Sequence, residues 1–176
     1  MEIKTVYLYG NITNKKIMEL IKEINEWLAE VGEKKTINGM MLWIYINSKW
    51  WEVNAWLWFC DYINELKHII QIETYAIWNC HSIAHLIFSA WSHRNAYKST
   101  EFYIHLPYFQ NSWWNEKEIE DDIKRLKNYK EKMLNYYVTS YNKSKLKKEE
   151  VEKLLEQWYW HNSDEAIKLW FADKLI

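Results

Sequence analysis

The chain has 176 residues, of which 49% are apolar, and its formal net charge is −1. This size and apolar content fit one compact domain with its own core. The balanced charge excludes the large basic surface of a protein that binds nucleic acid or an anionic membrane. No window approaches the ~20 apolar residues of a membrane span, so we expect no membrane partner.

The N-terminal residues 1–9 lack the basic region, long apolar core and small-residue cleavage site of a signal peptide, so we expect a cytoplasmic protein. Residues 4–9 instead have the pattern of a short strand, closed by Gly10. Thr13 or Asn14 can cap the helix that follows. Its apolar residues recur at the helical period, at Ile17, Leu20, Ile21, Ile24 and Leu28.

The middle of the chain repeats this alternation. Residues 42–46 are a buried-strand candidate, and residues 50–51 would form its turn. A helix over 53–66 and a strand over 69–77 follow, and Ser82 opens another helix. Units of strand, turn and helix feed a mostly parallel sheet, so the sequence predicts the α/β class.

The pattern changes after Asn115 to a long charged helix that reaches Tyr141. Its apolar residues lie on one side, at Ile119, Ile123, Leu126, Met133 and Leu134. A second helix over 147–157 and a short one over 164–169 complete the chain. Cys60 and Cys80 have neither metal-ligand spacing nor a secretory context, so we expect two reduced thiols and neither a metal nor another cofactor.

Ser82 and His105 are a candidate nucleophile and base. A serine hydroxyl needs a base to take its proton, and a neutral imidazole suits that role near neutral pH. A serine between a strand and a helix also has helix N–H groups beside it for a forming oxyanion. Three readings compete: Ser82 as an ordinary helix cap, His105 as a partly buried strand residue, and His85 as a rival base.

Tryptophan is abundant where glycine is scarce, with 13 Trp against 3 Gly, whereas glycine is usually about 7% of a chain. Reading some of these tryptophans as glycine restores a recognisable pattern. Those positions are Trp50, Trp51, Trp56, Trp78, Trp91 and Trp170.

With that reading, residues 44–57 resemble the Ile-Asn-Ser-Pro-Gly-Gly segment of the Clp protease proteolytic subunit (ClpP) family. Residues 78–84 resemble the segment that carries the family's nucleophilic serine, and residues 103–107 its Met-Ile-His-Gln-Pro segment. Residues 163–173 resemble its C-terminal Ala-x-Glu-Ala…Gly-Leu-x-Asp segment. The matches follow the family's order, from Val6 to Ile176, and only a short segment precedes Val6 where the family has its axial gate.

The resemblance implies a crotonase-type α/β fold of repeated β-β-α units with a projecting helical handle. It implies a single domain over 1–176, with a head at about 1–110 and 158–176 and a handle at about 111–157. It also implies a serine endopeptidase of a self-compartmentalised protease, whose subunits stack as two rings and hydrolyse unfolded polypeptides. A separate ring-shaped, ATP-dependent unfoldase is the implied partner.

The family's site residues can be transferred to this sequence one by one. Ser82 would be the nucleophile and His105 the base, and the N–H groups of Trp51 and Ile83 would form the oxyanion hole. The position of the catalytic Asp falls on Trp158, whose indole is only a donor. The third triad member is therefore unassigned, and its candidates are Glu156 and Asp164.

Two other functions stay open. The chain could be a catalytically impaired paralogue that serves as a structural ring subunit, or an acyl-CoA enzyme of the crotonase type, for which the sequence offers no phosphate-cradling residues. The tryptophans have three explanations. In the first, UGA codons that the source organism reads as glycine were translated here as tryptophan. In the second, the chain is a degenerate paralogue. In the third, the tryptophans form a packed aromatic core.

Overall fold

The computed structural model describes residues 2–33, 39–49, 53–91, 93–108, 115–139 and 146–176. In chain order the elements are β1 (Glu2–Tyr9), α1 (Asn14–Glu33), β2 (Met40–Ser48), α2 (Val53–Leu66), β3 (Gln71–His81), α3 (Ile83–Ser89), β4 (His93–Ala96), β5 (Glu101–Ile104), α4 (Glu116–Thr139), α5 (Lys148–Glu156), β6 (Tyr159–Asn162), α6 (Ser163–Lys168) and β7 (Lys174–Leu175).

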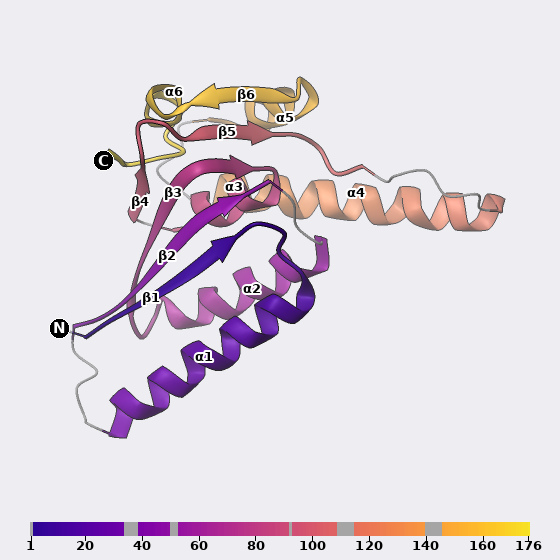
Figure 1. Ribbon diagram of the computed structural model, residues 1–176. Coiled ribbons are helices and arrows are strands. Elements are labelled where there is room, and N and C mark those ends of the chain that lie inside the picture. The colour runs from indigo at the N-terminus through magenta and orange to yellow at the C-terminus, as the bar shows by residue number, and fades with distance from the viewer. Residues whose placement is uncertain (1, 34–38, 50–52, 92, 109–114, 140–145) are drawn as a thin grey trace.

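The predicted α/β class is confirmed by a mostly parallel sheet. Its main strands run in the order β1-β2-β3-β4-β7, all parallel, and β5 adds to the far end of β3. The antiparallel pair is β5 with β6. Helices α1 and α2 cover one face of β1–β3, and α4 extends away from the sheet (Figure 1). Along the described residues the order β-β-α occurs at β4-β5-α4.

Most predicted elements form where the sequence places them. The helix over 53–66 matches α2, and the strand over 69–77 becomes β3, which continues to His81. The Thr13 hydroxyl accepts the Lys16 N–H at 3.3 Å, which is the predicted cap of α1. Side chains of β2 alternate between buried and half-buried, as expected for a strand with helices on one face.

A bulge bends β3 and gives it two sets of neighbours. Ile46 pairs with Ala76 but Ser48 pairs with Cys80, so β3 has two extra residues between these pairs. Trp78 lies in this bulge at φ 58°, with an exposed indole. Before the bulge β3 pairs with β4, and after it with β5. The bulge therefore turns the end of β3, and Ser82 with it, toward β5.

Two helix ends also place tryptophan in the left-handed region. Trp170 follows Leu169, the C-cap of α6, at φ 62°. Its N–H donates to Ile167 O, and the Phe171 N–H donates to Ala166 O. This is the Schellman arrangement, in which glycine is usual. Trp158, just past α5, has φ 53°. Besides these two and Trp78, Ser82 is the other non-glycine residue with positive φ among the described ranges.

The tryptophans that the sequence analysis interpreted as glycine divide into two kinds. Trp78 and Trp170 adopt the backbone conformation that glycine adopts without strain. Trp56 and Trp91 are buried, and within the described residues their indole N–H groups have no acceptor. Trp50 and Trp51 lie outside the described residues. An aromatic core can therefore account for Trp56 and Trp91 but not for the exposed Trp78 and Trp170.

The apolar side of α4 is buried only toward its C-terminus, although the polar Asp122 in its first half is buried as well. Met133, Leu134 and Tyr137 are buried, whereas Ile119 and Ile123 are 49% and 47% exposed. The first half of α4 projects from the body of the molecule (Figure 1). None of the helices in the described ranges is both long and apolar enough to cross a membrane.

Candidate active site

Ser82 lies at a strained turn between β3 and α3. Its backbone has φ 55° and ψ −121°, a region that side-chain-bearing residues rarely adopt. It precedes the first residue of α3, but its hydroxyl makes no capping hydrogen bond. An ordinary capping serine has an extended backbone and an oxygen bonded to the first turn. The capping interpretation therefore explains neither the backbone of Ser82 nor its side chain.

The β3–β5 pairing brings Ser82 to the strand that leads to His105. His81 is in register with Tyr103, and the Ser82 N–H donates to Tyr103 O at 2.5 Å. His105 follows the end of β5 by one residue. No hydrogen bond joins Ser82 Oγ to His105 in the described part of the chain. Catalytic hydrogen bonds often form only when substrate binds, so the lack of this bond does not exclude the pair.

His105 is oriented by its own strand end and by aromatic rings. Its Nδ1 lies 2.7 Å from Leu106 O, and its ring stacks on Trp158 with centroids 5.1 Å apart. The rings of Tyr103 and Tyr108 lie 5.1 and 5.4 Å from it. Burial lowers the pKa of His105, and the hydrogen bond to the Leu106 carbonyl opposes that shift. The imidazole is therefore neutral near pH 7, as a general base must be.

Within the described residues, neither candidate for the third triad member forms a hydrogen bond with the His105 imidazole. Glu156 is ion-paired with Lys130 of α4 at 3.6 Å, and Asp164 is exposed in the first turn of α6. Trp158, where the resemblance places the catalytic Asp, does lie against His105. That position is thus beside the imidazole, but its side chain supplies a ring face and no acceptor.

The rival base His85 is part of the core. Its side chain is fully buried in α3, its Nδ1 lies 2.9 Å from the Tyr137 hydroxyl, and its Nε2 has no partner among the described residues. His161 of β6 lies beside it, with ring centroids 5.2 Å apart. Burial moves the pKa of His85 well below its usual value. No hydrogen bond within the described residues links His85 to the Ser82 hydroxyl.

One of the two expected oxyanion donors can be described. Ile83 is the first residue of α3, where helical N–H groups have no partner within the helix. Trp51, the other expected donor, lies outside the described residues.

An aromatic wall beside the site was not foreseen from the sequence. Trp160 of β6 stacks on Tyr103 with centroids 4.3 Å apart and contacts the ring of His81. Burial and the nearby Lys49 lower the pKa of His81 to about 4. The available signal was the alternation of Trp158, Trp160 and Asn162 with the residues between them, which indicates a common side. The wall flanks the His105 side of the site.

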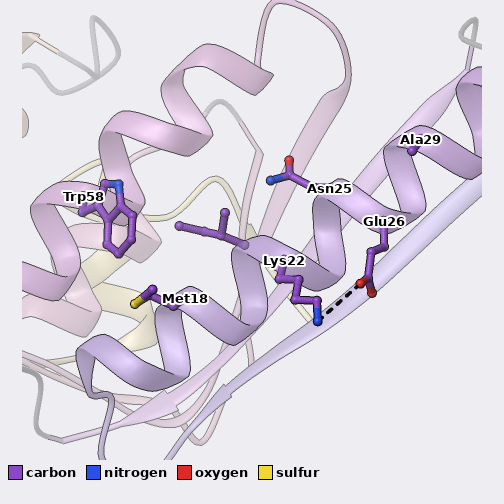
Figure 2. A pocket seen from close by; sticks show the side chains of 7 residues that line it. Met18, Lys22, Asn25, Glu26, Ala29 and Trp58 are labelled. Atoms are coloured by element: carbon purple, nitrogen blue, oxygen red, sulfur yellow. Dashed lines mark ion pairs between the residues drawn. The ribbon is translucent and has the colours of Figure 1, made fainter.

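A separate groove lies between α1 and α2. Figure 2 shows Trp58 of α2 opposite Met18 of α1, with Lys22 paired to Glu26 at 3.8 Å. The residues that line the groove include no serine, threonine, cysteine or histidine, so it is not the candidate active site. Within the described residues no cluster of three or more His, Cys, Asp or Glu could hold a metal. Cys60 and Cys80 are buried free thiols, as predicted.

Comparison with known families gives one match over the full length. The family model described as Clp protease matches residues 1–176. A comparison with curated proteins gives no match.

Proposed function

The chain belongs to the Clp protease family, and from this premise we propose that it is a serine endopeptidase subunit of a self-compartmentalised Clp-type protease in the cytoplasm. Its substrates are unfolded polypeptides, bound as an added β-strand beside the site. Ser82 attacks the peptide carbonyl, and His105 acts first as general base and then as general acid. The N–H groups of Trp51 and Ile83 stabilise the oxyanion.

The backbone of Ser82 is the observation that carries this proposal. Ser82 has φ 55° at a strand-turn-helix junction, and within the described residues its hydroxyl makes no capping bond, which supports a chemical role for it. Strain of this kind is concentrated at functional sites. The β3–β5 pairing then supplies a neutral histidine from the neighbouring strand.

Labelling by a fluorophosphonate tests the proposal. The expected result is one label per chain, found on Ser82 by peptide mass spectrometry and lost in Ser82→Ala. Ser99→Ala, an exposed serine in the turn after β4, is the matched control and should label normally. A protein that stays unlabelled under these conditions would contradict the peptidase function.

We also propose that the head, at about 1–110 and 158–176, and the handle, at about 111–157, form one domain that assembles into stacked rings. Exposed Ile119 and Ile123 on the projecting half of α4 support a handle contact between copies. Sedimentation velocity should show large particles that the double variant Ile119→Asp, Ile123→Asp reduces to smaller ones. Ile69→Asp, an exposed isoleucine far from α4 in sequence, is the control. A ring-shaped ATP-dependent unfoldase is the proposed partner.

Trp158 favours the second candidate, a catalytically impaired ring subunit. It lies against His105 at the position where the family has its catalytic Asp, and indole cannot accept the imidazole proton. Loss of that orienting carboxylate costs on the order of 10⁴ in turnover in serine proteases. This alternative predicts assembly into rings without labelling of Ser82.

A further inference from the structure

The acceptor that holds His105 is a main-chain carbonyl. Nδ1 of His105 lies 2.7 Å from Leu106 O. A carbonyl oxygen can only accept, so Nδ1 carries the proton and Nε2 keeps its lone pair. This is the tautomer in which Nε2 can take a proton from a serine hydroxyl. A neutral backbone group therefore selects the tautomer that a carboxylate selects in a catalytic triad.

The carbonyl is itself fixed from two sides. Pro107, the single proline of the chain, follows Leu106, and a residue before proline is restricted to extended conformations. The Leu106 N–H donates to Leu155 O at 3.2 Å, at the end of α5. The residue that carries the acceptor is thus anchored by a hydrogen bond on one side and by a proline ring on the other.

No carboxylate competes for the imidazole in the described ranges. The groups that face it are the rings of Tyr103 from β5, Tyr108 after β5 and Trp158 after α5, with His81 of β3 nearby. His105 has no ion pair with any described acid. Glu156 is paired with Lys130 instead.

We propose that Ser82 and His105 work as a dyad, in which the Leu106 carbonyl, held by Pro107, orients the imidazole in place of a carboxylate. This inference rests on the proposed peptidase function. Leu106 and Pro107 are positioning residues, because they act through His105 and do not touch the reacting atoms. Trp158 stacks on one face of the ring, and Nε2 makes no hydrogen bond to the described residues.

The dyad has a distinctive pH behaviour. A carboxylate beside an imidazole raises the pKa of that imidazole, whereas a neutral carbonyl does so much less. Burial lowers the pKa of His105, and the Leu106 hydrogen bond only partly offsets this. Activity should fall at acid pH as His105 is protonated, with a midpoint below about 6.5.

Nitrogen NMR of the histidine rings tests the orientation without relying on activity. The expected spectrum of His105, assigned by its loss in His105→Gln, is that of the Nδ1–H tautomer at pH 7.5. Pro107→Ala should weaken the protection of this proton from exchange and lower turnover about 5- to 20-fold, since a restriction on Leu106 is removed. An Nε2–H tautomer in the unaltered protein would overturn the proposal.

Variants of the acidic candidates test the absence of a carboxylate. Glu156→Gln and Asp164→Asn should each change turnover less than about threefold, because neither acid orients the ring. A loss near the ~10⁴ expected for a triad orienter, in either variant, would overturn the dyad. Trp158→Asp should raise the acid midpoint by about one pH unit. An unchanged midpoint would mean that a carboxylate already faces His105, and it would also overturn the dyad.

The two proposals fail in different ways. Labelling of Ser82 together with an Nε2–H tautomer would reject the role of the Leu106 carbonyl and leave the peptidase function standing. An unlabelled Ser82 together with the Nδ1–H tautomer would reject the peptidase function and, with it, the dyad. Only the orientation of His105 by the Leu106 carbonyl would then stand.

Discussion

His85 and His105 are both histidines within reach of Ser82 by sequence reasoning, but they lie in opposite environments. His85 is three residues after Ser82 in α3, and it is fully buried among aromatic rings. His105 is 23 residues after Ser82, beyond β5, and it is 9% exposed. The histidine nearer in sequence belongs to the core, and the farther one follows the strand that pairs with the end of β3, next to which Ser82 lies in sequence.

The difference lies in what each ring nitrogen meets. Nε2 of His85 is buried without a partner among the described residues, so a proton there would be an uncompensated charge. Nδ1 of His105 has a fixed acceptor, the Leu106 carbonyl. Its Nε2 is not one of the buried nitrogen atoms that lack a hydrogen-bond partner in the described residues. A base must gain and lose a proton during turnover, and only the second environment permits that.

The largest expected effect separates the two histidines by activity. His105→Ala should lower turnover by about 10³- to 10⁴-fold, because the dyad loses its base. His85→Leu should change turnover less than about tenfold, although it leaves the buried Tyr137 hydroxyl without its partner. Hydrolysis of a fluorogenic peptide at saturating substrate measures both variants. The opposite order of effects would assign the base to His85.

Acid sensitivity of folding is the second expected effect, and it comes from the histidines whose pKa values are lowered: His81, His105 and the core pair His85 and His161. Burial lowers the pKa of His161 to about 3 and that of His85 well below 6.5. As pH falls below 6.5, the unfolded chain binds protons at these histidines before the folded chain does. The free energy of unfolding should therefore fall with pH, by up to about 1.4 kcal/mol per pH unit for each histidine. The loss should continue down to about pH 3 for His161.

Substitution of His161 isolates its share of this acid sensitivity. His161→Phe keeps the stacking on Phe102, whose ring lies at 13° to it, and removes the titrating group. Urea unfolding at pH 7 and pH 5 should show a pH slope about one third smaller than that of the unaltered protein, because His81 and His85 still have lowered pKa values. His68→Gln, at an exposed turn, controls for the loss of one histidine from the chain. Equal slopes in His161→Phe and the unaltered protein would contradict the buried pair as the cause.

Much of the frame was predictable from local patterns. Apolar patterns predicted α2 to the residue and β1, α1, β2 and β3 with ends that differ by a few residues, because each element buries one regular face. The same rule failed in α4, where Ile119 and Ile123 continue the apolar side but lie exposed. Periodicity shows which side of a helix is apolar, but not whether another element covers it.

The candidate site was only half predictable. Ser82 and His105 came from motif order, but the bulge at Trp78 that aims β3 at β5 has no periodic signal. The Leu106 carbonyl could not be foreseen, since every residue has one and only tertiary placement selects it. The stacking of Trp158 on His105 arises because the segment after α5 turns at positive φ, which sequence rules assign to glycine.

The smallest expected effect concerns these left-handed turns, which position aromatic rings against His105 and His85. Trp158 lies against His105, and Trp170 turns the chain so that Phe171 packs on His85 with ring centroids 4.9 Å apart. Trp170→Gly should be more stable than Trp170→Ala by about 1 kcal/mol, because alanine at positive φ keeps the Cβ clash. Chemical denaturation of the two variants measures the difference.

The same pair of substitutions at Trp58 should give the opposite sign, which makes it the matched control. Trp58 lies inside α2, where alanine is favoured over glycine by about 1 kcal/mol. Peptide mass spectrometry of the protein from its own source then reads residues 78 and 170 directly. If glycine is found at residues 78 and 170, this would agree with Trp170→Gly being more stable than Trp170→Ala. It would favour the explanation that UGA codons were read as tryptophan in place of glycine. Tryptophan there, with alanine as stable as glycine at 170, would show that this turn does not require a left-handed residue and would remove the backbone argument for recoding.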